Sequence, residues 1–348
     1  MFQRLIKNDL KENKVSMLVI GLFLLLTLTL SFAATRLTVS LTSSIERFVE
    51  TAKSPHLLQM HSGSVDRERL QNFVQQHSEI ASWQVTDFVN VEGSAIRINE
   101  KDSLQDSSQD NGFSSQNQNF DFLLDQYNRP AQPQPGQVYI PLYYYNSGKI
   151  KIGDQIRIGK LQLTVQGYIR DAQMNAGLVS SKRFLISQAD LETLKKEAFA
   201  SNENLIAFRV HKLSQISAIE QAYKNAELES NGPPMITYPT IKMINGFNDA
   251  LVILVMGLLV VAIIGITFLC MRFALLTKIQ EDLQQIAVMK VMGLPQSFIS
   301  RVYLTKYYFC LALATIVGWG LSFLLSTPFK KQMALSMGQS PTPFYSYL

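Results

Sequence analysis

The residues that could carry out chemistry in this 348-residue chain are few and far apart. The histidines lack the spacing of metal ligands, and the cysteines form neither a zinc-binding pattern nor a disulfide framework. These residues are His56, His61, His77, His211, Cys270 and Cys310. The sequence therefore predicts no metal site.

Neighbouring residues suggest one catalytic arrangement, a serine–lysine pair at Ser180, Ser181 and Lys182. Adjacent residues of an extended strand point to opposite faces, and no oxyanion motif accompanies them. The chain also lacks a G-x-x-x-x-G-K-[ST] phosphate loop. We therefore expect no catalytic residue and no cofactor, and we expect that the chain is not an enzyme.

Three long apolar runs indicate the class of protein. The composition is 47% hydrophobic and 17% charged, and much of the hydrophobicity falls in runs that are long enough to cross a bilayer. We expect transmembrane helices at residues 15–36, 249–272 and 302–327. The net charge of +5 is modest and many of its carriers flank these runs, so nucleic acid is not an expected partner.

Basic residues mark one side of the membrane. They are Arg4, Lys7, Lys11 and Lys14 before the first span, and Arg272, Lys278, Lys290, Arg301 and Lys306 between the other two. The positive-inside rule then predicts a multi-pass protein of the cell membrane with a cytoplasmic N-terminus. Residues 1–14 are expected to form a cytoplasmic interfacial helix on lipid, and residues 328–348 an extracytoplasmic tail.

The cytoplasmic segment 273–301 has the spacing of an amphipathic helix. Its apolar stripe is Leu276, Ile279, Leu283, Ile286 and Met289, and Lys278, Glu281, Asp282 and Gln285 lie away from it. Gly293 is a natural residue just past a helix end, and a new helix can begin at Pro295. We expect a helix and a turn against the membrane surface, either as a coupling element or as a simple connector.

The residues EDLQQIAVMKVMGLP in this segment resemble the signature of FtsX/MacB-type ABC transporter permeases. Glu281 matches the leading acid, Lys290 the basic position and Gly293 the closing glycine, whereas Gln285 and Ala287 replace the usual Glu and Gly. The resemblance implies a coupling helix that docks on a separate ATPase subunit, which binds the ATP. The coupling residues so implied are Ile279, Glu281, Leu283, Gln285, Ile286, Met289, Lys290, Gly293 and Pro295.

The extracytoplasmic part, residues 54–248, follows a stalk helix at residues 37–53. A strand–helix–strand pattern occurs twice, which predicts an α+β domain of two βαβ halves with a ferredoxin-like fold. The predicted elements are Leu57–His61, Ser64–Glu79 with Ser64 as its N-cap, Trp83–Val91, Leu205–Val210, Ser214–Glu227 and Met235–Tyr238.

An insert of about a hundred residues, 99–203, separates the two halves. The polar stretch Asn99–Asn119 lacks periodicity and is expected to be mobile. Further on the insert becomes β-rich, with a hairpin of Gln155–Ile158 and Leu161–Ile169 around Gly159. This organisation again resembles the extracytoplasmic domain of MacB-type permeases.

The segment Arg170–Phe184 concentrates polar side chains, at Arg170, Asp171, Asn175, Lys182 and Arg183. One interpretation is a loop that contacts a peptide or a lipid. The interpretation that we favour is structural, with these side chains capping a neighbouring strand and helix.

Small residues recur at intervals of four in two spans, which lets a neighbouring helix approach closely. They are Gly257 and Gly265 in the second span, with Val261 between them at the same interval, and Ala314, Gly318 and Ser322 in the third. We expect these positions to pack against other helices.

The resemblance implies a permease subunit that passes ATPase-driven motion to the extracytoplasmic domain. Its cargo would be peptides, lipids or lipoproteins, or it would control cell-wall hydrolases. The expected partners are an ABC ATPase, membrane lipid and a second permease copy or half. Because such permeases have at least four spans, we expect a chain cut short after the third. The alternative is a transmembrane sensor with an extracytoplasmic ligand-binding domain.

Overall fold

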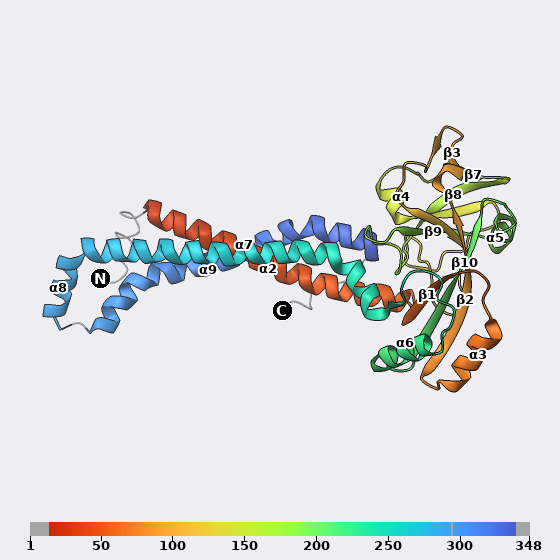
Figure 1. Cartoon of the computed structure of the whole chain (residues 1–348). Helices are drawn as coiled ribbons and strands as arrows, with labels where there is room; N and C mark the ends of the chain where they lie inside the picture. Colours follow the sequence, from red (N-terminus) through yellow and green to blue (C-terminus); the bar gives the residue numbers. More distant parts are fainter. Residues whose placement is uncertain (1–13, 294, 339–348) are drawn as a thin grey trace. The chain divides into compact units, whose positions relative to one another are not determined.

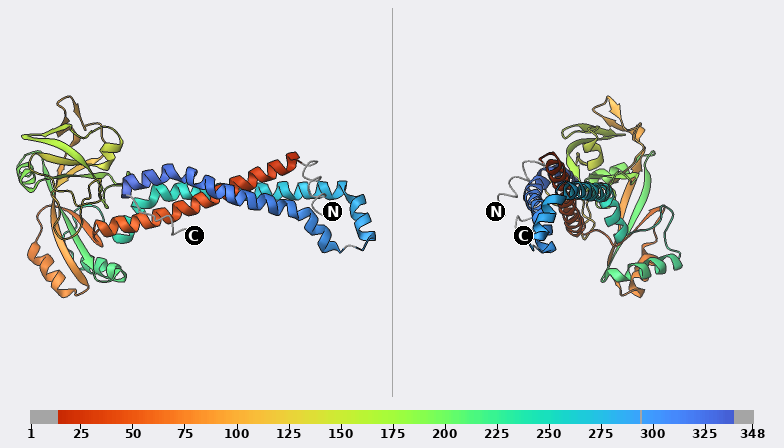
Figure 2. Two further views of the ribbon diagram at one scale, coloured as in Figure 1. Left: turned by 180° about the vertical axis from the view of Figure 1, so that it is seen from behind. Right: turned by 90° about the vertical axis from the view of Figure 1, so that its left-hand side faces the viewer.

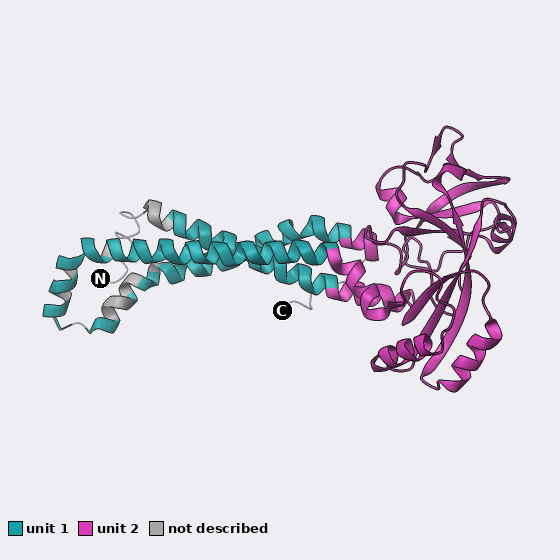
Figure 3. Cartoon of the chain, viewed as in Figure 1, with its two compact units in different colours: residues 1–41, 248–332 teal, residues 42–247, 333–348 magenta. Residues whose placement is uncertain are grey.

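The computed structural model describes residues 14–293 and 295–338 and divides the chain into two compact units. Unit 1 consists of residues 1–41 and 248–332, and unit 2 of residues 42–247 and 333–348 (Figure 3). Residues 1–13 of the predicted interfacial helix and residues 339–348 of the predicted tail lie outside the described residues.

The described part of unit 1 is helical, with three long helices and one short helix (Figures 1 and 2). The helices are α2 (Lys14–Thr51), α7 (Tyr238–Glu281), α8 (Leu283–Val291) and α9 (Gln296–Met337). By length and composition, three helical stretches could cross a membrane, at Leu18–Thr51, Tyr238–Glu281 and Tyr307–Met337. The prediction of three apolar helices of membrane-spanning length is confirmed.

The helix α9 continues beyond residue 327, where the third span was predicted to end. Pro328 lies inside α9 and has no N–H to donate to the preceding turn. Prolines are tolerated in such helices where other groups bond to the freed carbonyls. The helix ends at Met337, so the first ten residues of the predicted tail are helical.

The described part of unit 2 contains one mixed β-sheet with the order β11-β1-β10-β2-β5-β9-β6-β8-β7-β3-β4 (Figure 1). The strands are β1 (Leu57–Ser62), β2 (Ile80–Val91), β3 (Ile96–Ile98), β4 (Asp102–Ser103), β5 (Asp110–Ser114), β6 (Gln137–Pro141), β7 (Gln155–Ile158), β8 (Leu161–Ile169), β9 (Ser181–Ile186), β10 (Ser201–Val210) and β11 (Ile236–Thr237). The shorter helices are α3 (Arg67–Gln76), α4 (Leu142–Asn146), α5 (Gln188–Leu194) and α6 (Ile216–Asn225), and the 3-10 turns are η1 (Gly93–Ala95) and η2 (Leu213–Gln215).

Both predicted strand–helix–strand patterns are present, as β1–α3–β2 and β10–α6–β11. The two patterns interleave, since β10 lies between β1 and β2 and β1 lies between β10 and β11. Each neighbouring pair among these strands is antiparallel. Both helices contribute to one buried cluster with the strands, formed around Leu70, Phe73, Phe208, Ile219 and Tyr223. Burial of apolar area in this cluster stabilises the packing of α3 and α6 on the sheet.

The helix α3 starts later than the sequence suggested. Its N-cap is Asp66 and not Ser64, because the Asp66 carboxylate accepts hydrogen bonds from the backbone N–H groups of Glu68 and Arg69 at 3.1 and 3.0 Å. Both Ser and Asp are favoured N-cap residues, so the sequence alone offered two starting points.

The stretch Asn99–Asn119 is not structureless, contrary to the prediction. It contains β4 and β5, and β5 pairs with β2 on one side and with β9 on the other. Asn111, Gly112 and Phe113 are buried. A Cβ on Gly112 would lie 1.8 Å from the Phe88 ring, so only glycine fits this position. The buried residues are partly polar, which hid the strand from a hydrophobicity pattern.

The predicted hairpin of the insert is confirmed. β7 and β8 pair in antiparallel fashion around Gly159, which has a φ of +55°. A second buried cluster forms on this side of the sheet, with Ile140, Ile156, Leu163, Val165 and Phe184 among its members.

Candidate functional site

A buried cation holds together two distant segments of unit 2. Arg183, on β9, forms a bidentate pair with Asp171, with Nε–Oδ2 at 2.7 Å and Nη2–Oδ1 at 2.9 Å. Its Nη1 donates to Asp121 Oδ2 at 3.1 Å. The Arg183 side chain is fully buried, and those of both acids nearly so. Charge-assisted bonds in such an environment are strong when every partner is in place. We call Asp121, Asp171 and Arg183 the ionic junction.

The electrostatics of the ionic junction depend on all three members. Burial raises the pKa of Asp121, and the charge of Arg183 opposes that effect. Burial works to lower the pKa of Arg183, but the charges of Asp171 and Asp121 outweigh it and raise that pKa. Gln173 Nε2 donates to the second oxygen of Asp121, so both oxygens of this carboxylate are occupied. Removing the Arg183 cation would leave the buried carboxylates of Asp121 and Asp171 without a counter-charge.

The ionic junction is linked to the end of helix α2. The backbone N–H of Asp121 donates to Lys53 O at 3.0 Å, and that of Phe122 donates to Ala52 O at 2.7 Å. These carbonyls follow the last residues of α2, where helices have carbonyl groups without partners in the helix. The segment that carries Asp121 therefore caps the end of α2.

Arg170 and Asn175 hold the end of helix α9 inside unit 2. Arg170 Nε donates to Leu335 O at 2.7 Å, and Asn175 Nδ2 donates to Ser336 O at 2.8 Å. The Arg170 Nη1 also donates to Asp125 O and Asn128 Oδ1, both at 2.8 Å. A cation near the carbonyl end of a helix is favoured by the helix dipole as well as by these bonds. Burial lowers the pKa of Arg170 from its ordinary value.

The same segment also meets the start of helix α7. Asn245 Nδ2 donates to Ala172 O at 2.5 Å and to Ile241 O at 2.8 Å. Residues 170–175 thus bond to α7 and α9, and Asp171 connects them through Arg183 to the segment that caps α2. Within unit 2, one small network binds the adjoining parts of all three long helices.

Lys182 closes the loop between β8 and β9. Its buried ammonium donates to the carbonyl oxygens of Met174, Ala176 and Val179 at 3.2, 2.8 and 2.5 Å. Burial lowers the pKa of Lys182 to about 8, and Asp171 works in the opposite direction. The lysine is committed to this loop, which agrees with the expectation that it forms no catalytic pair with Ser180 or Ser181.

The polar side chains singled out in Arg170–Phe184 have their partners inside the protein. Arg170, Asp171, Lys182 and Arg183 are each at most 4% exposed, and their partners lie within the chain. Asn175 is half-buried and bonds to α9. These side chains stabilise the loop and bind helix ends, as the structural interpretation expects, and a contact of this loop with a peptide or a lipid stays a prediction. Their network is formed by residues up to 165 positions apart, which sequence spacing could not show.

The segment expected to be a coupling helix is α8, which is shorter than predicted. Helix α7 continues to Glu281, α8 runs over Leu283–Val291, and α9 begins at Gln296. Gly293 has a φ of +81° and follows the last residue of α8 by two positions, as expected for a residue just past a helix end. The interpretation of this segment as an ATPase-coupling element stays a prediction.

Apolar side chains of α8 are exposed in the described structure. The exposed fractions are 58% for Leu283, 58% for Val288 and 89% for Val291. Ile279, Glu281, Lys290, Gly293 and Pro295 are exposed as well, whereas Ile286 is half-buried. The side chains of the two other predicted coupling residues, Gln285 and Met289, lie outside the described residues.

The small residues of α9 and α7 differ in their surroundings within unit 1. A Cβ on Gly318 would lie 3.2 Å from the backbone N of Thr29 on α2, and Ala314 and Ser322 are buried. A Cβ on Gly257 or Gly265 would meet nothing within 4 Å. The sequence analysis expected Gly257 and Gly265 to pack against another helix. This stays a prediction, and the partner would be a helix other than those that the structure describes.

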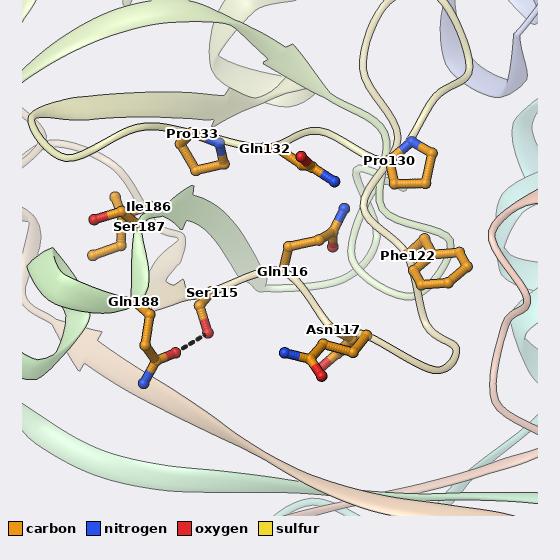
Figure 4. Close-up of a pocket in the computed structure, with 11 residues that line it drawn as sticks. Ser115, Gln116, Asn117, Phe122, Pro130, Gln132, Pro133, Ile186, Ser187 and Gln188 are labelled. Atoms are coloured by element: carbon orange, nitrogen blue, oxygen red, sulfur yellow. Dashed lines mark hydrogen bonds between the residues drawn. The ribbon is translucent and has the colours of Figure 1, made fainter.

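A cavity of about 620 Å³ lies in unit 2 beside the loop that follows β5 (Figure 4). Its lining has amide, hydroxyl and apolar groups: Ser115, Gln116, Asn117, Gln118, Phe122, Pro130, Gln132, Pro133, Ile186, Ser187 and Gln188. The sequence analysis did not find this site. The sequence signal for this site was the run of Ser, Gln and Asn residues after β5. That run was missed because its composition resembles that of an unfolded linker.

Among the described residues, no group of three or more His, Cys, Asp or Glu side chains could hold a metal ion. Cys270 and Cys310 are free thiols.

A comparison with protein families found a match over part of the chain. Residues 236–348, which include α7, α8 and α9, match the family described as FtsX-like permease C-terminal. The resemblance to these permeases that the sequence predicted is thus confirmed for this part. A comparison with curated proteins gave no match.

Two solved structures are similar to the chain at low sequence identity. The periplasmic region of MacB from Actinobacillus actinomycetemcomitans is 10% identical, with 56% of this chain and 94% of that chain covered and a TM-score of 0.30. The extracellular domain of the noncanonic ABC-type transporter YknZ from Gram-positive bacteria is 12% identical, with 52% and 98% covered and a TM-score of 0.28.

Proposed function

We propose that this chain, whose residues 236–348 carry the FtsX-like permease C-terminal region, is the permease subunit of an ABC transporter complex. The family match is the observation that carries the proposal, and the three apolar helices of membrane-spanning length support it. A separate ATPase subunit would bind and hydrolyse ATP. Lipid and a second permease copy or half would complete the assembly.

The proposed orientation puts α8 in the cytoplasm and the β-sheet outside. Arg272, Lys290 and Arg301 flank or lie on α8, and basic residues are retained on the cytoplasmic side of membrane proteins. On this orientation β11, β1, β10 and β2, with α3 and α6, form a ferredoxin-like extracytoplasmic body that carries the β-rich insert.

The docking surface proposed for the ATPase is α8. Leu283, Val288 and Val291 expose apolar area there, and covering such area with a partner is favourable by roughly 25 cal/mol per Å². Movement imposed on α8 would pass along α7 and α9, which are joined to it through short turns.

The ionic junction is the proposed receiver of that movement. Helices α2, α7 and α9 each contribute residues to both units, and in unit 2 their ends are bonded to the segments that carry Asp121 and Asp171. A shift of one helix would therefore act on the others through a rigid, buried network. The proposed output is mechanical work on a peptide, lipid or lipoprotein, or on a cell-wall hydrolase.

Leu283→Asp tests the docking surface directly. It places a charge where a partner surface would be apolar, and burying that charge without a counter-charge costs several kcal/mol, which corresponds to a loss of affinity of about a thousandfold. The neighbouring Gln284→Asp adds the same charge at a polar position and is the matched control. The measurement is co-purification of a co-expressed ABC ATPase from the same genome with each variant in detergent. Equal recovery of the ATPase with both variants would contradict the assignment of α8.

A further inference from the structure

The cavity beside the loop after β5 has the size and the lining of a ligand site. Its volume of about 620 Å³ lies within the range of about 300–1,000 Å³ that small-molecule sites occupy. Figure 4 shows the side chains of Gln116, Gln132 and Asn117 between Phe122 on one side and the Ser115–Gln188 pair on the other. We propose that this cavity binds a neutral saccharide.

The absence of charge in the lining defines the class of ligand. The residues that line the cavity include five carboxamides and two serine hydroxyls, and none is Asp, Glu, Lys, Arg or His. A phosphate, a carboxylate or an amine would find no counter-charge among them. A carboxamide offers a donor and an acceptor side by side, which match the hydroxyl groups of a sugar. Phe122, Pro130 and Pro133 supply apolar faces for the C–H side of a sugar ring.

Two of the carboxamides are available to a ligand. Within the part of the chain that the structure describes, the side chains of Gln118 and Gln132 make no hydrogen bond, and both are exposed. Other amides of the lining are held in place by the protein. Gln116 exchanges hydrogen bonds with the backbone of Leu123 at 2.8 and 3.1 Å, and Asn117 accepts from Thr86 Oγ1 at 2.7 Å. The site thus combines a wall that is already held in place, which lowers the entropy cost of binding, with two side chains that are free to turn toward a ligand.

The sheet beside the cavity disfavours an extended peptide as the ligand. Peptides bound beside a sheet obtain much of their affinity by pairing with a free strand edge. The strands next to this cavity are β5 and β9, and each has a neighbour on both sides in the order β2-β5-β9-β6. Recognition must then come from side chains, and here these side chains are amides, hydroxyls and one aromatic ring.

The position of the cavity connects a bound ligand to helix α2. Phe122 lines the cavity, and its backbone N–H donates to Ala52 O at 2.7 Å. Asn117 also lines the cavity, and its Nδ2 donates to Asp121 Oδ2, a member of the ionic junction, at 3.1 Å. A ligand that presses on Phe122 or Asn117 would therefore act on the residues that cap α2. Saccharide binding itself goes beyond the proposed permease function and does not depend on an ATPase.

The test is a titration of the full chain in phosphatidylcholine nanodiscs with three neutral trisaccharides, N,N′,N″-triacetylchitotriose, cellotriose and maltotriose. A tripeptide of alanine with blocked ends is the comparison probe. We expect saturable calorimetric binding of at least one trisaccharide and none of the tripeptide. The double variant Gln118→Ala/Gln132→Ala should weaken that binding by about tenfold or more, because it removes two sets of amide hydrogen bonds.

Gln134→Ala is the matched control, since Gln134 is an exposed glutamine of the same loop that does not line the cavity. It should bind as the unchanged chain does. The proposal is overturned if no trisaccharide binds, if the double variant binds as tightly as the control, or if the tripeptide binds in place of the sugars. Because no ATPase is present, these outcomes are independent of the test of α8.

Discussion

The α8 helix and the segment from Arg170 to Arg183 depart in opposite ways from the usual placement of side chains. In α8, Val291 is 89% exposed although it is apolar. In the second segment, Arg183 is 1% exposed although it is charged. Charged side chains are almost never fully buried unless they are paired, whereas single exposed apolar residues are common. The two regions therefore need different explanations.

The difference lies in whether the interactions are complete within the chain. Arg183 has charged partners at 2.7 and 3.1 Å, and Lys182 and Arg170 donate to carbonyl groups close by. The exposed apolar residues of α8 are not covered by other side chains in the described structure. Burying them against a partner or a membrane would therefore be favourable. In these two regions, charge is thus buried and paired within the chain, and apolar area is exposed.

Arg183→Met should have the largest effect on stability. It removes the cation from between Asp121 and Asp171, and breaking a buried ion pair in this way costs roughly 3–5 kcal/mol. The measurement is thermal unfolding of the full chain in detergent, followed by the fluorescence of Trp83 in a Trp319→Phe background.

Arg157→Met is the control for that experiment. Arg157 pairs with Glu100 at 3.0 Å, but the two side chains are 52% and 73% exposed, and such pairs contribute about 0–1 kcal/mol. If both substitutions lowered stability by the same amount, the contrast between buried and exposed charges would fail.

Arg170→Met should have an intermediate and more local effect. It removes the bond to Leu335 O and those to Asp125 O and Asn128, at a cost of roughly 1–3 kcal/mol. We expect faster amide hydrogen exchange at residues 333–337, where α9 is held. Arg129→Met, an exposed arginine of the neighbouring loop, should leave exchange there unchanged. Unchanged exchange in Arg170→Met would mean that α9 is held by other contacts.

Val291→Asp should have the smallest effect on stability. The side chain is already exposed, and substitutions at such positions usually change stability by no more than about 0.5 kcal/mol in either direction. The same thermal unfolding assay measures it. A loss as large as that of Arg183→Met would show that α8 is part of a packed core, and the contrast between the two regions would disappear.

Local patterns in the sequence were sufficient for the features that depend on neighbouring residues. The apolar runs predicted the three long helices, because a run of some twenty apolar residues is itself the signal for a span. Gly159 and its flanking alternation predicted the β7–β8 hairpin, and Gly293 marked the turn after α8, because positive φ is local and favours glycine. The match to the FtsX-like family likewise rested on a continuous stretch of sequence.

Only the tertiary structure decided the roles of the polar residues. Arg183 pairs with Asp121, which is 62 positions away in the sequence, and Arg170 donates to the carbonyl of Leu335, which is 165 positions away. The polar stretch after Asn99 becomes strand because β2 and β9 pair with β5 on either side, and the cavity lies beside the loop that follows β5. A polar side chain looks the same in a sequence whether water or a distant partner satisfies its hydrogen bonds. Its burial depends on long-range pairing of strands, and no local periodicity encodes that pairing.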